Sequence, residues 1–393
     1  MLSEQNRRFI SEHMVDDTAE LLLHRDRFPG INVPLAVTQI EGRRKAIHKL
    51  PSLANNPDFV FPPKLNLEQA SSELTAEYKS CNFVEGNIVI DITGGLGIDS
   101  IYFAKRAKKV FYIEQNPELF EVAKYNFEVL GINNIECICA NSEEILQTWC
   151  YTADLIYADP ARRDQNNRKM VSFADCTPDI VSILPGLFRI APQVLIKASP
   201  MLDITQARRE LQKVVSTTVV AVKNECRELL FFCCDVDNGQ HSTTCVNILA
   251  NDICQTFSPT PGELLAKPSL APLPMRYIYD PNVAIAKAML SNAVAERFGL
   301  SILHPRSRFA TSDTLFRDYP GRIFELCSVK QLSDRDIVKE FPEGQANVIC
   351  CNFPQTADQL RKQLRLREGG SGFLIATTVG DNQKIGIICK KVQ

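Results

Sequence analysis

The feature that most constrains the fold is a regular alternation of strand-like and helix-like segments that begins near residue 86. Strands joined through helices must run parallel, because such a connection crosses back over the sheet. The sequence therefore predicts an α/β fold with a mostly parallel sheet and helices on both faces. The expected strands are the apolar, β-branched runs NIVIDIT, KVFYIEQ, IECICAN, ADLIYADP and QVLIKAS, followed by TTVVAVK and ELLFFCCDV as a closing antiparallel hairpin.

Other patterns flank this region. The N-terminal part shows helical periodicity without strand alternation, and a later stretch holds five of the chain's twenty-two prolines. The last sixty or so residues have a strand, helix, strand, strand order. We therefore expect an N-terminal helical region over 1–85, the α/β domain over 86–256, a proline-rich linker over 257–275 and a small C-terminal α+β module.

Composition narrows the function classes. The fourteen cysteines form no C-x-x-C pair and no His cluster accompanies them, so neither a metal site nor a disulfide framework is expected. We expect most of them to be buried free thiols, which suits a reducing compartment. The charged N-terminus lacks an apolar signal core and no stretch has the length of a membrane span, so a cytoplasmic protein is expected.

A glycine-rich motif lies where the first strand meets a helix, and it includes Gly94, Gly95 and Gly97. Glycines let a backbone turn tightly and approach a ligand closely. The dinucleotide fingerprint would need glycine at Ser100, and no Walker motif follows. Glu114 ends the next strand, where a carboxylate is placed to bind two ribose hydroxyls. The alternative is a simple turn beside a solvated strand end.

A second polar loop, beginning at Asp159-Pro160, closes the fourth strand. Ligands of open α/β sheets bind at the carboxyl ends of the strands, so this loop should face the same site. Arg162 and Arg163 have the fork geometry that suits phosphate, or else they pair with nearby Asp164 or Asp175. Lys197, at the end of the fifth strand, meets substrate or pairs with an acidic neighbour.

Over about residues 65–240 these motifs resemble the class I methyltransferase superfamily, which has a Rossmann-like sheet and uses S-adenosyl-L-methionine. The resemblance implies that the first motif holds the aminoacid end of the cofactor, Glu114 the ribose, and Asn141-Ser142 the adenine. The full set of implied cofactor residues is Asp91, Gly94, Gly95, Gly97, Asp99, Glu114, Asn141, Ser142 and Asp159.

The loop after the fourth strand resembles the (D/N)-P-P-(Y/F/R) motif of methyltransferases that act on amines and RNA bases. There the acidic side chain accepts a hydrogen bond from the target amine. Ala161 and Arg162 depart from the second proline and from the usual aromatic residue, so the target atom stays open. The implied catalytic set is Asp159, Pro160, Arg162, Arg163 and Lys197. A helix that begins with Leu67–Thr75 lies where the superfamily has an extra motif that contacts the cofactor. The equal alternative is that the polar face of this helix only contacts solvent.

The C-terminal module is basic. Residues 355–393 carry a net charge of +4, whereas the whole chain carries −2. Such asymmetry is typical of an appended nucleic-acid-binding module, although a helix made soluble by its charges is an alternative. The candidate RNA-binding residues, expected on one broad helical face, are Arg361, Lys362, Arg365 and Arg367.

The whole layout resembles bacterial methyltransferases with a ferredoxin-like segment, here 276–325, and a THUMP-like α+β module, here 326–393. The segments ADPARRD, VLIKASPMLD and FPQTADQLRKQLRLREGG carry this resemblance. It implies methyl transfer to a base nitrogen of a structured RNA, such as tRNA or rRNA. Two alternatives remain: a methyltransferase of proteins or small molecules, and a non-catalytic RNA-binding protein.

Overall fold

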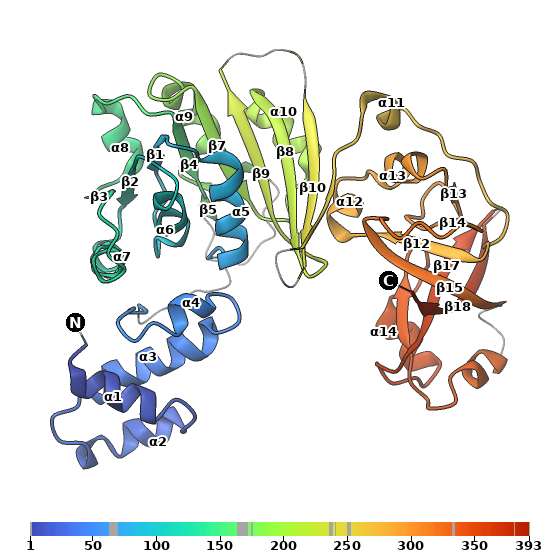
Figure 1. Cartoon of the computed structure of the whole chain (residues 1–393), viewed down its shortest axis with the longest axis horizontal. Coiled ribbons are helices and arrows are strands. Elements are labelled where there is room, and N and C mark those ends of the chain that lie inside the picture. The colour runs from blue at the N-terminus through green and yellow to red at the C-terminus, as the bar shows by residue number, and fades with distance from the viewer. Residues whose placement is uncertain are drawn as a thin grey trace. The chain divides into compact units, whose positions relative to one another are not determined.

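The arrangement of the elements is given by a computed structural model (Figure 1). The chain divides into two compact units, residues 1–216 with 230–241, and residues 217–229 with 242–393. Within the described part of the chain, no helix combines the length and the apolar character needed to cross a membrane. The described residues are 2–62, 70–162, 172–173, 176–235, 239, 241–249, 253–331, 335–380 and 382–392.

The N-terminal region is helical, as predicted. Its helices are α1 (Glu4–Glu12), α2 (Thr18–Leu23), η1 (Arg25–Arg27), α3 (Val33–Ala46) and α4 (Pro51–Ala54). The first two begin at side-chain caps, since Ser3 and Asp17 accept hydrogen bonds from backbone N–H groups of the first turn. Phe59 and Phe61, on the segment after α4, are buried in the same core as Ile101 and Phe127 of the α/β domain.

Arg43 of α3 fixes the irregular segment that follows α4. Its guanidinium is buried and donates to four backbone carbonyl oxygens, those of Ala54, Asn56, Pro57 and Phe59, at 2.6–3.1 Å. An irregular segment lacks the regular hydrogen-bond ladder of a helix or sheet, and buried carbonyls need partners. One side chain therefore shapes the chain that leads into the α/β domain.

The α/β domain contains the predicted parallel sheet. Its central strands pair in parallel in the order β7-β4-β1-β2-β3, and the nine-stranded sheet continues through β9, β8, β10 and β11. The strands are β1 (Ile88–Asp91), β2 (Lys109–Glu114), β3 (Ile135–Cys139), β4 (Leu155–Ala158), β7 (Gln193–Ala198), β8 (Val214–Val222), β9 (Glu225–Cys234), β10 (Ser242–Ile248) and β11 (Cys254–Phe257). The helices are α5 (Glu73–Phe83), α6 (Ile98–Ala104), α7 (Pro117–Val129), α8 (Ser142–Ile145), η2 (Leu146–Thr148), α9 (Ile180–Leu187) and α10 (Ile204–Leu211).

The strands follow the predicted segments closely. The closing hairpin is also present: β8 and β9 are joined by Lys223-Asn224, both with φ near +50 to +60°, which is the geometry of a two-residue hairpin turn. The expected helix over the segment LNLEQASSELTAEYKS is shorter than predicted, because Ser72 caps α5 and the helix begins at Glu73. Residues 65–69 of that segment lie outside the described residues.

The second unit contains a seven-stranded sheet of order β13-β14-β12-β15-β18-β17-β16. The C-terminal strand, helix, strand, strand order is confirmed by β16, α14, β17 and β18. The elements are α11 (Pro261–Leu264), β12 (Tyr277–Pro281), α12 (Val283–Lys287), α13 (Ser291–Arg297), β13 (Ser301–Ile302), β14 (Ala310–Ser312), β15 (Gly321–Lys330), η5 (Arg335–Glu340), β16 (Asn347–Cys350), α14 (Ala357–Gln363), β17 (Gly372–Val379) and β18 (Gln383–Lys391).

A buried carboxylate ties three parts of this second sheet together. Asp280 on β12 is 1% exposed. Its two oxygens accept from Arg308, before β14, at 2.6 Å and from Arg322, on β15, at 2.5 Å. A buried charge of this kind is tolerated only when it is paired.

Two expectations were wrong. The helix-forming residues of DPNVAIAKAMLSNAVAERFG predict a single helix that ends before Gly299. The segment instead forms α12 and α13, separated at Met289, whose φ is +59°. Most cysteines were expected to be buried, yet only Cys176, Cys233, Cys245 and Cys389 are fully so. Apolar neighbours in sequence do not bury a side chain that points to the outer face of a strand.

We predict that Arg43→Met lowers the free energy of unfolding by about 3 kcal/mol or more, because several buried carbonyls lose their donor. Urea unfolding followed by circular dichroism measures this loss. Arg8→Met is the matched control, since Arg8 is exposed and pairs only with Glu12 one turn along the same helix. Equal losses in both variants would contradict the role given to Arg43.

Candidate active site

The glycine-rich turn between β1 and α6 is shaped by two aromatic side chains. The Gly94 N–H donates to the Ile113 carbonyl at 2.9 Å, and a Cβ at Gly94 would lie 2.2 Å from the Tyr112 ring. Gly97 has φ +77°, and a Cβ there would lie 2.6 Å from Phe127. Only glycine fits either position, so the turn lies directly on β2 and α7.

Glu114, at the end of β2, lies against this turn. Its Oε2 accepts from the Gly95 N–H at 2.7 Å, and its Oε1 accepts from the Asn116 N–H at 2.7 Å. The Tyr112 hydroxyl donates to the Gly95 carbonyl at 2.5 Å. The ends of β1 and β2 therefore form one polar corner at the carboxyl edge of the sheet.

Asp91 is buried beneath the turn. Its carboxylate accepts from the Ser100 hydroxyl at 2.6 Å and from the Thr93 N–H at 3.1 Å. Burial raises the pKa of Asp91 to about 7, against the opposing effect of the Ser100 hydrogen bond. In this structure the side chain holds the two ends of the turn together.

The Asp159 loop is attached to the glycine turn. The Asp159 N–H donates to the Thr93 hydroxyl at 2.7 Å, and the Ile92 N–H donates to the Tyr157 carbonyl at 3.0 Å. Pro160, the next residue, is buried. Two loops that are 66 residues apart in sequence are thus held at one edge.

Lys197 pairs with Asp159, which is the acidic-neighbour alternative expected for it. Lys197 Nζ lies 2.5 Å from Asp159 Oδ2, with side-chain exposures of 9% and 31% respectively. Burial raises the pKa of Asp159, and the charge and hydrogen bond of Lys197 oppose that rise. Asp159 is thus a partly exposed carboxylate at the strand end, supported from beneath by a buried cation.

Asp99 belongs to the same buried group. Its Oδ2 accepts from the Ser71 hydroxyl at 2.7 Å and from the Tyr157 hydroxyl at 2.8 Å, and its Oδ1 lies 3.1 Å from Lys79 Nζ. Burial raises the pKa of Asp99, but Lys79 and Lys197 outweigh it and hold that pKa below its ordinary value. The sequence does not single out Lys79 or Tyr157 as site residues.

The remaining sequence-predicted residues are more peripheral. Asn141 caps α8, accepting from the Glu144 N–H, and its amide donates to Gln115 at 3.3 Å. Ser142 is the first residue of α8. Arg162 lies on the short strand β5 (Ala161–Arg162), which pairs with β6 (Cys176–Thr177). Arg163, Asp164 and Asp175 lie outside the described residues.

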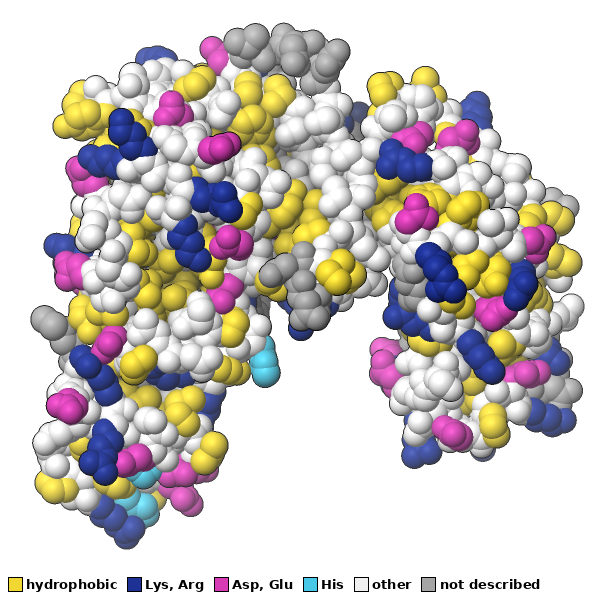
Figure 2. Space-filling view, in the orientation of Figure 1, with side chains coloured by type: hydrophobic (Ala, Val, Ile, Leu, Met, Phe, Trp, Pro, Cys, Tyr) yellow, Lys and Arg dark blue, Asp and Glu magenta, His cyan; other side chains and the backbone are white. Residues whose placement is uncertain are grey.

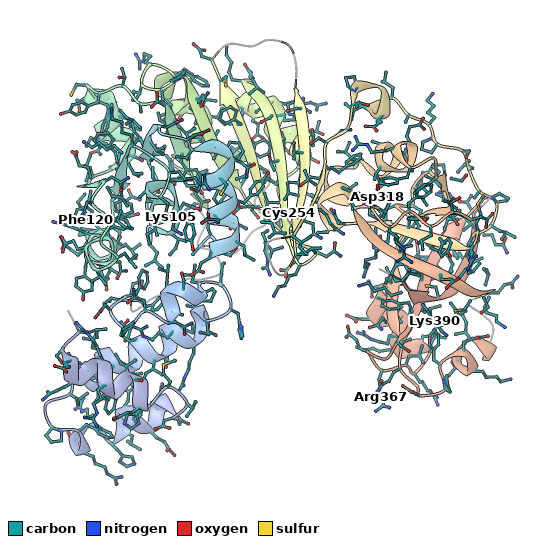
Figure 3. The ribbon with its side chains drawn as sticks, viewed as in Figure 1. Lys105, Phe120, Cys254, Asp318, Arg367 and Lys390 are labelled. Carbon is teal, nitrogen blue, oxygen red and sulfur yellow. The ribbon has the colours of Figure 1, made fainter. Side chains whose placement is uncertain are left out.

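The C-terminal basic residues do not share one helical face. α14 ends at Gln363, and Arg365 follows with φ +56°, so its expected helical spacing from Arg361 was wrong. Arg361 is half-buried and pairs with Asp358 and with Glu368. Lys362, Arg365 and Arg367 are exposed, and Figure 3 shows Arg367 directed away from its ribbon.

The wider surface is mixed in charge. On the face drawn in Figure 2, Lys and Arg side chains are interspersed with Asp and Glu. In the described part of the chain, no group of three or more His, Cys, Asp or Glu side chains is placed to hold a metal ion.

The corner formed by β1 and β2 fits an adenosyl amino acid. A Cβ at Gly95 would meet only the Thr93 carbonyl, at 3.8 Å, so the turn presents open backbone beside Glu114. A carboxylate at this position suits two ribose hydroxyls. The residues present therefore fit S-adenosyl-L-methionine, which supplies an activated methyl group when bound.

Comparisons with known proteins agree with this geometry. Residues 86–181 match the family model described as RNA cap guanine-N2 methyltransferase, residues 277–320 match a ferredoxin-like domain, and residues 321–391 match a THUMP domain-like family.

A solved structure matches the whole chain. It is the crystal structure of a protein described as a methyltransferase from Porphyromonas gingivalis W83, with 30% identity, a TM-score of 0.87 and coverage of 99% of this chain and 98% of that one. The chain belongs to this methyltransferase family. The family resemblance and the fold class expected from the sequence are thereby confirmed.

Two further relatives extend the comparison of this methyltransferase. An uncharacterised S-adenosylmethionine-dependent methyltransferase of Mycobacterium tuberculosis is 24% identical over 91% of this chain and 95% of its own length. An uncharacterised RNA methyltransferase of Oceanobacillus iheyensis is 38% identical over 85 residues, but this chain spans only 18% of its length. The cofactor expected from the sequence is confirmed as S-adenosyl-L-methionine.

The raised pKa of Asp91 predicts how stability varies with pH. Between about pH 4 and 7 the folded chain keeps a proton on Asp91, whereas the unfolded chain releases it. The contribution of Asp91 to folding therefore becomes less favourable as pH rises through this window. We expect Asp91→Asn to weaken the fall in Tm between pH 5 and pH 8, as measured by thermal unfolding. An unchanged pH dependence would contradict the assignment.

Proposed function

We propose that this methyltransferase transfers a methyl group to a base nitrogen of a structured RNA. The observation that carries the proposal is the Asp159 carboxylate, which lies at the carboxyl edge of β4, partly exposed and next to the glycine turn. An amine donates hydrogen bonds to such a carboxylate, and its lone pair is thereby directed toward an electrophile bound in the corner.

The chemistry required of the protein is mostly placement. Methyl transfer from a sulfonium needs the nucleophile in line and within about 3–3.5 Å, and orientation of this kind lowers barriers substantially. A carboxylate beside the nitrogen also stabilises the positive charge that develops there. Asp159 can serve both purposes, since Lys197 and the Thr93 hydroxyl fix its position.

Two further observations support RNA as the substrate. The family model that matches residues 86–181 is described as a methyltransferase of the RNA cap guanine N2, an exocyclic amine. The second unit ends in the THUMP-like segment, where Lys362, Arg365 and Arg367 are exposed. Exposed basic side chains supply the phosphate contacts that dominate affinity for nucleic acid.

We predict that Asp159→Ala reduces methyl transfer at least a hundredfold while the Kd for S-adenosylhomocysteine stays within about threefold, because the side chain serves the acceptor rather than the cofactor. Transfer is measured with a radiolabelled methyl donor and total RNA from a strain that lacks the gene. Asp203→Ala is the control, since Asp203 only caps α10. Methylation of a protein fraction instead of RNA would overturn the substrate class.

We predict that replacing Lys362, Arg365 and Arg367 together with Ala weakens RNA binding by the full chain across many sequences. Each lost phosphate contact should lower the magnitude of the salt slope by about 0.9 on a duplex, so a decrease of roughly two to three is expected. Filter binding at several salt concentrations measures it. Arg25 and Arg27, exposed on η1, form the matched control pair. An equal effect of both sets would contradict a local RNA surface.

A further inference from the structure

Beneath the Asp159 loop lies a buried group of charges that contains more than the expected site residues. Lys79, on α5, has no exposed side-chain surface. Its ammonium lies 3.1 Å from Asp99 Oδ1 and 3.0 Å from the Ser71 hydroxyl. A fully buried lysine is rare and requires specific compensation.

The Ser71 hydroxyl joins the two lysines. Its oxygen lies 3.0 Å from Lys79 Nζ, 3.1 Å from Lys197 Nζ and 2.7 Å from Asp99 Oδ2. A hydroxyl has one hydrogen to donate and two acceptor lone pairs. Because the lysines can only donate, the hydroxyl hydrogen goes to Asp99, and all the capacity of Ser71 is used.

These contacts form a continuous series from Lys79 on α5 to Asp159 in the loop after β4. Lys79 and Tyr157 hold Asp99, Ser71 connects Asp99 and Lys79 to Lys197, and Lys197 reaches Asp159. Among the described residues, two cations and two carboxylates of this group balance one another. Lys79 has no exposed side-chain surface and lies against Asp99 and Ser71, so it affects Asp159 through its charge and through these neighbours.

We propose that Lys79 and Ser71 are positioning residues, which hold the Lys197 ammonium against Asp159 and keep the Asp159 carboxylate in the ionised form that can accept a hydrogen bond. The benefit to catalysis rests on the function proposed above, whereas the charge balance itself does not. Among the described residues, the titratable and charged groups that act on Asp159 include Lys197 from β7, Asp99 from α6, Lys79 from α5 and Asp91 from β1.

The test is a titration of Asp159 in the full chain, followed by carbon-13 NMR of labelled aspartate carboxyl groups. The Asp159 signal is identified by its loss in Asp159→Asn. Lys79→Met removes a cation and should raise the titration midpoint by about one pH unit, whereas Asp99→Asn removes an anion and should lower it by a similar amount. The double variant should return close to the wild-type midpoint.

A merely structural role of Lys79 would not produce shifts of opposite sign that cancel. Lys105→Met is the matched control. Lys105, labelled in Figure 3, follows α6, is half-exposed and pairs with Glu77 of α5 at 3.5 Å, so its loss should leave the Asp159 midpoint unchanged. If Lys79→Met does not fold, Asp99→Asn alone tests the proposal, because the titration midpoint of Asp159 must fall in that variant. An unmoved midpoint in either variant, or shifts of the same sign, would overturn the proposal.

Activity provides the second readout. Ser71→Ala should lower kcat for RNA methylation about tenfold with the Kd for S-adenosylhomocysteine within threefold, and Ser71→Thr, which keeps the hydroxyl, should restore most of it. A wild-type chain that methylates no RNA would defeat the proposed function, but the NMR titration would still decide the charge balance.

Discussion

The carboxyl edge of the parallel sheet depends on the ion pair between Lys197 and Asp159 and on the buried charges behind it. Removing one member of a buried pair leaves an uncompensated charge, which typically costs about 3–5 kcal/mol. The group containing Asp99 and Lys79 therefore behaves as a whole. It holds the Asp159 loop in a fixed position while leaving the Asp159 side chain 31% exposed.

The same physical solution recurs elsewhere in the chain. Arg43 organises an irregular segment by donating to its carbonyls, and Asp280 joins strands by accepting from Arg308 and Arg322. In each case a buried charged side chain with several partners joins segments that are distant in sequence. Such contacts specify geometry more sharply than apolar packing does, because donor and acceptor directions are fixed.

The features that could be predicted best are those that a short stretch of sequence determines. The strands, the glycine turn and Glu114 follow from local periodicity and spacing, and the structure has them where expected. The burial of Lys79 could hardly be predicted, because little in the sequence distinguishes it from a surface lysine. It shares a helix face with Thr75, which is also buried. The left-handed conformation of Arg365 could not be predicted either, because it depends on how Leu364 and Leu366 pack into the core behind α14.

The bonds of Asp280 have a consequence for how this protein could have been assembled. Residues 277–320 and 321–391 match separate family models, yet Arg322 from the second reaches the carboxylate of the first, and a Cβ at Gly321 would lie 2.2 Å from the Asp280 carbonyl. β12 also pairs directly with β15. A THUMP-like segment transplanted alone would expose a sheet edge and lose the partner of Arg322, so recombination between relatives should exchange the two segments as one inheritable piece.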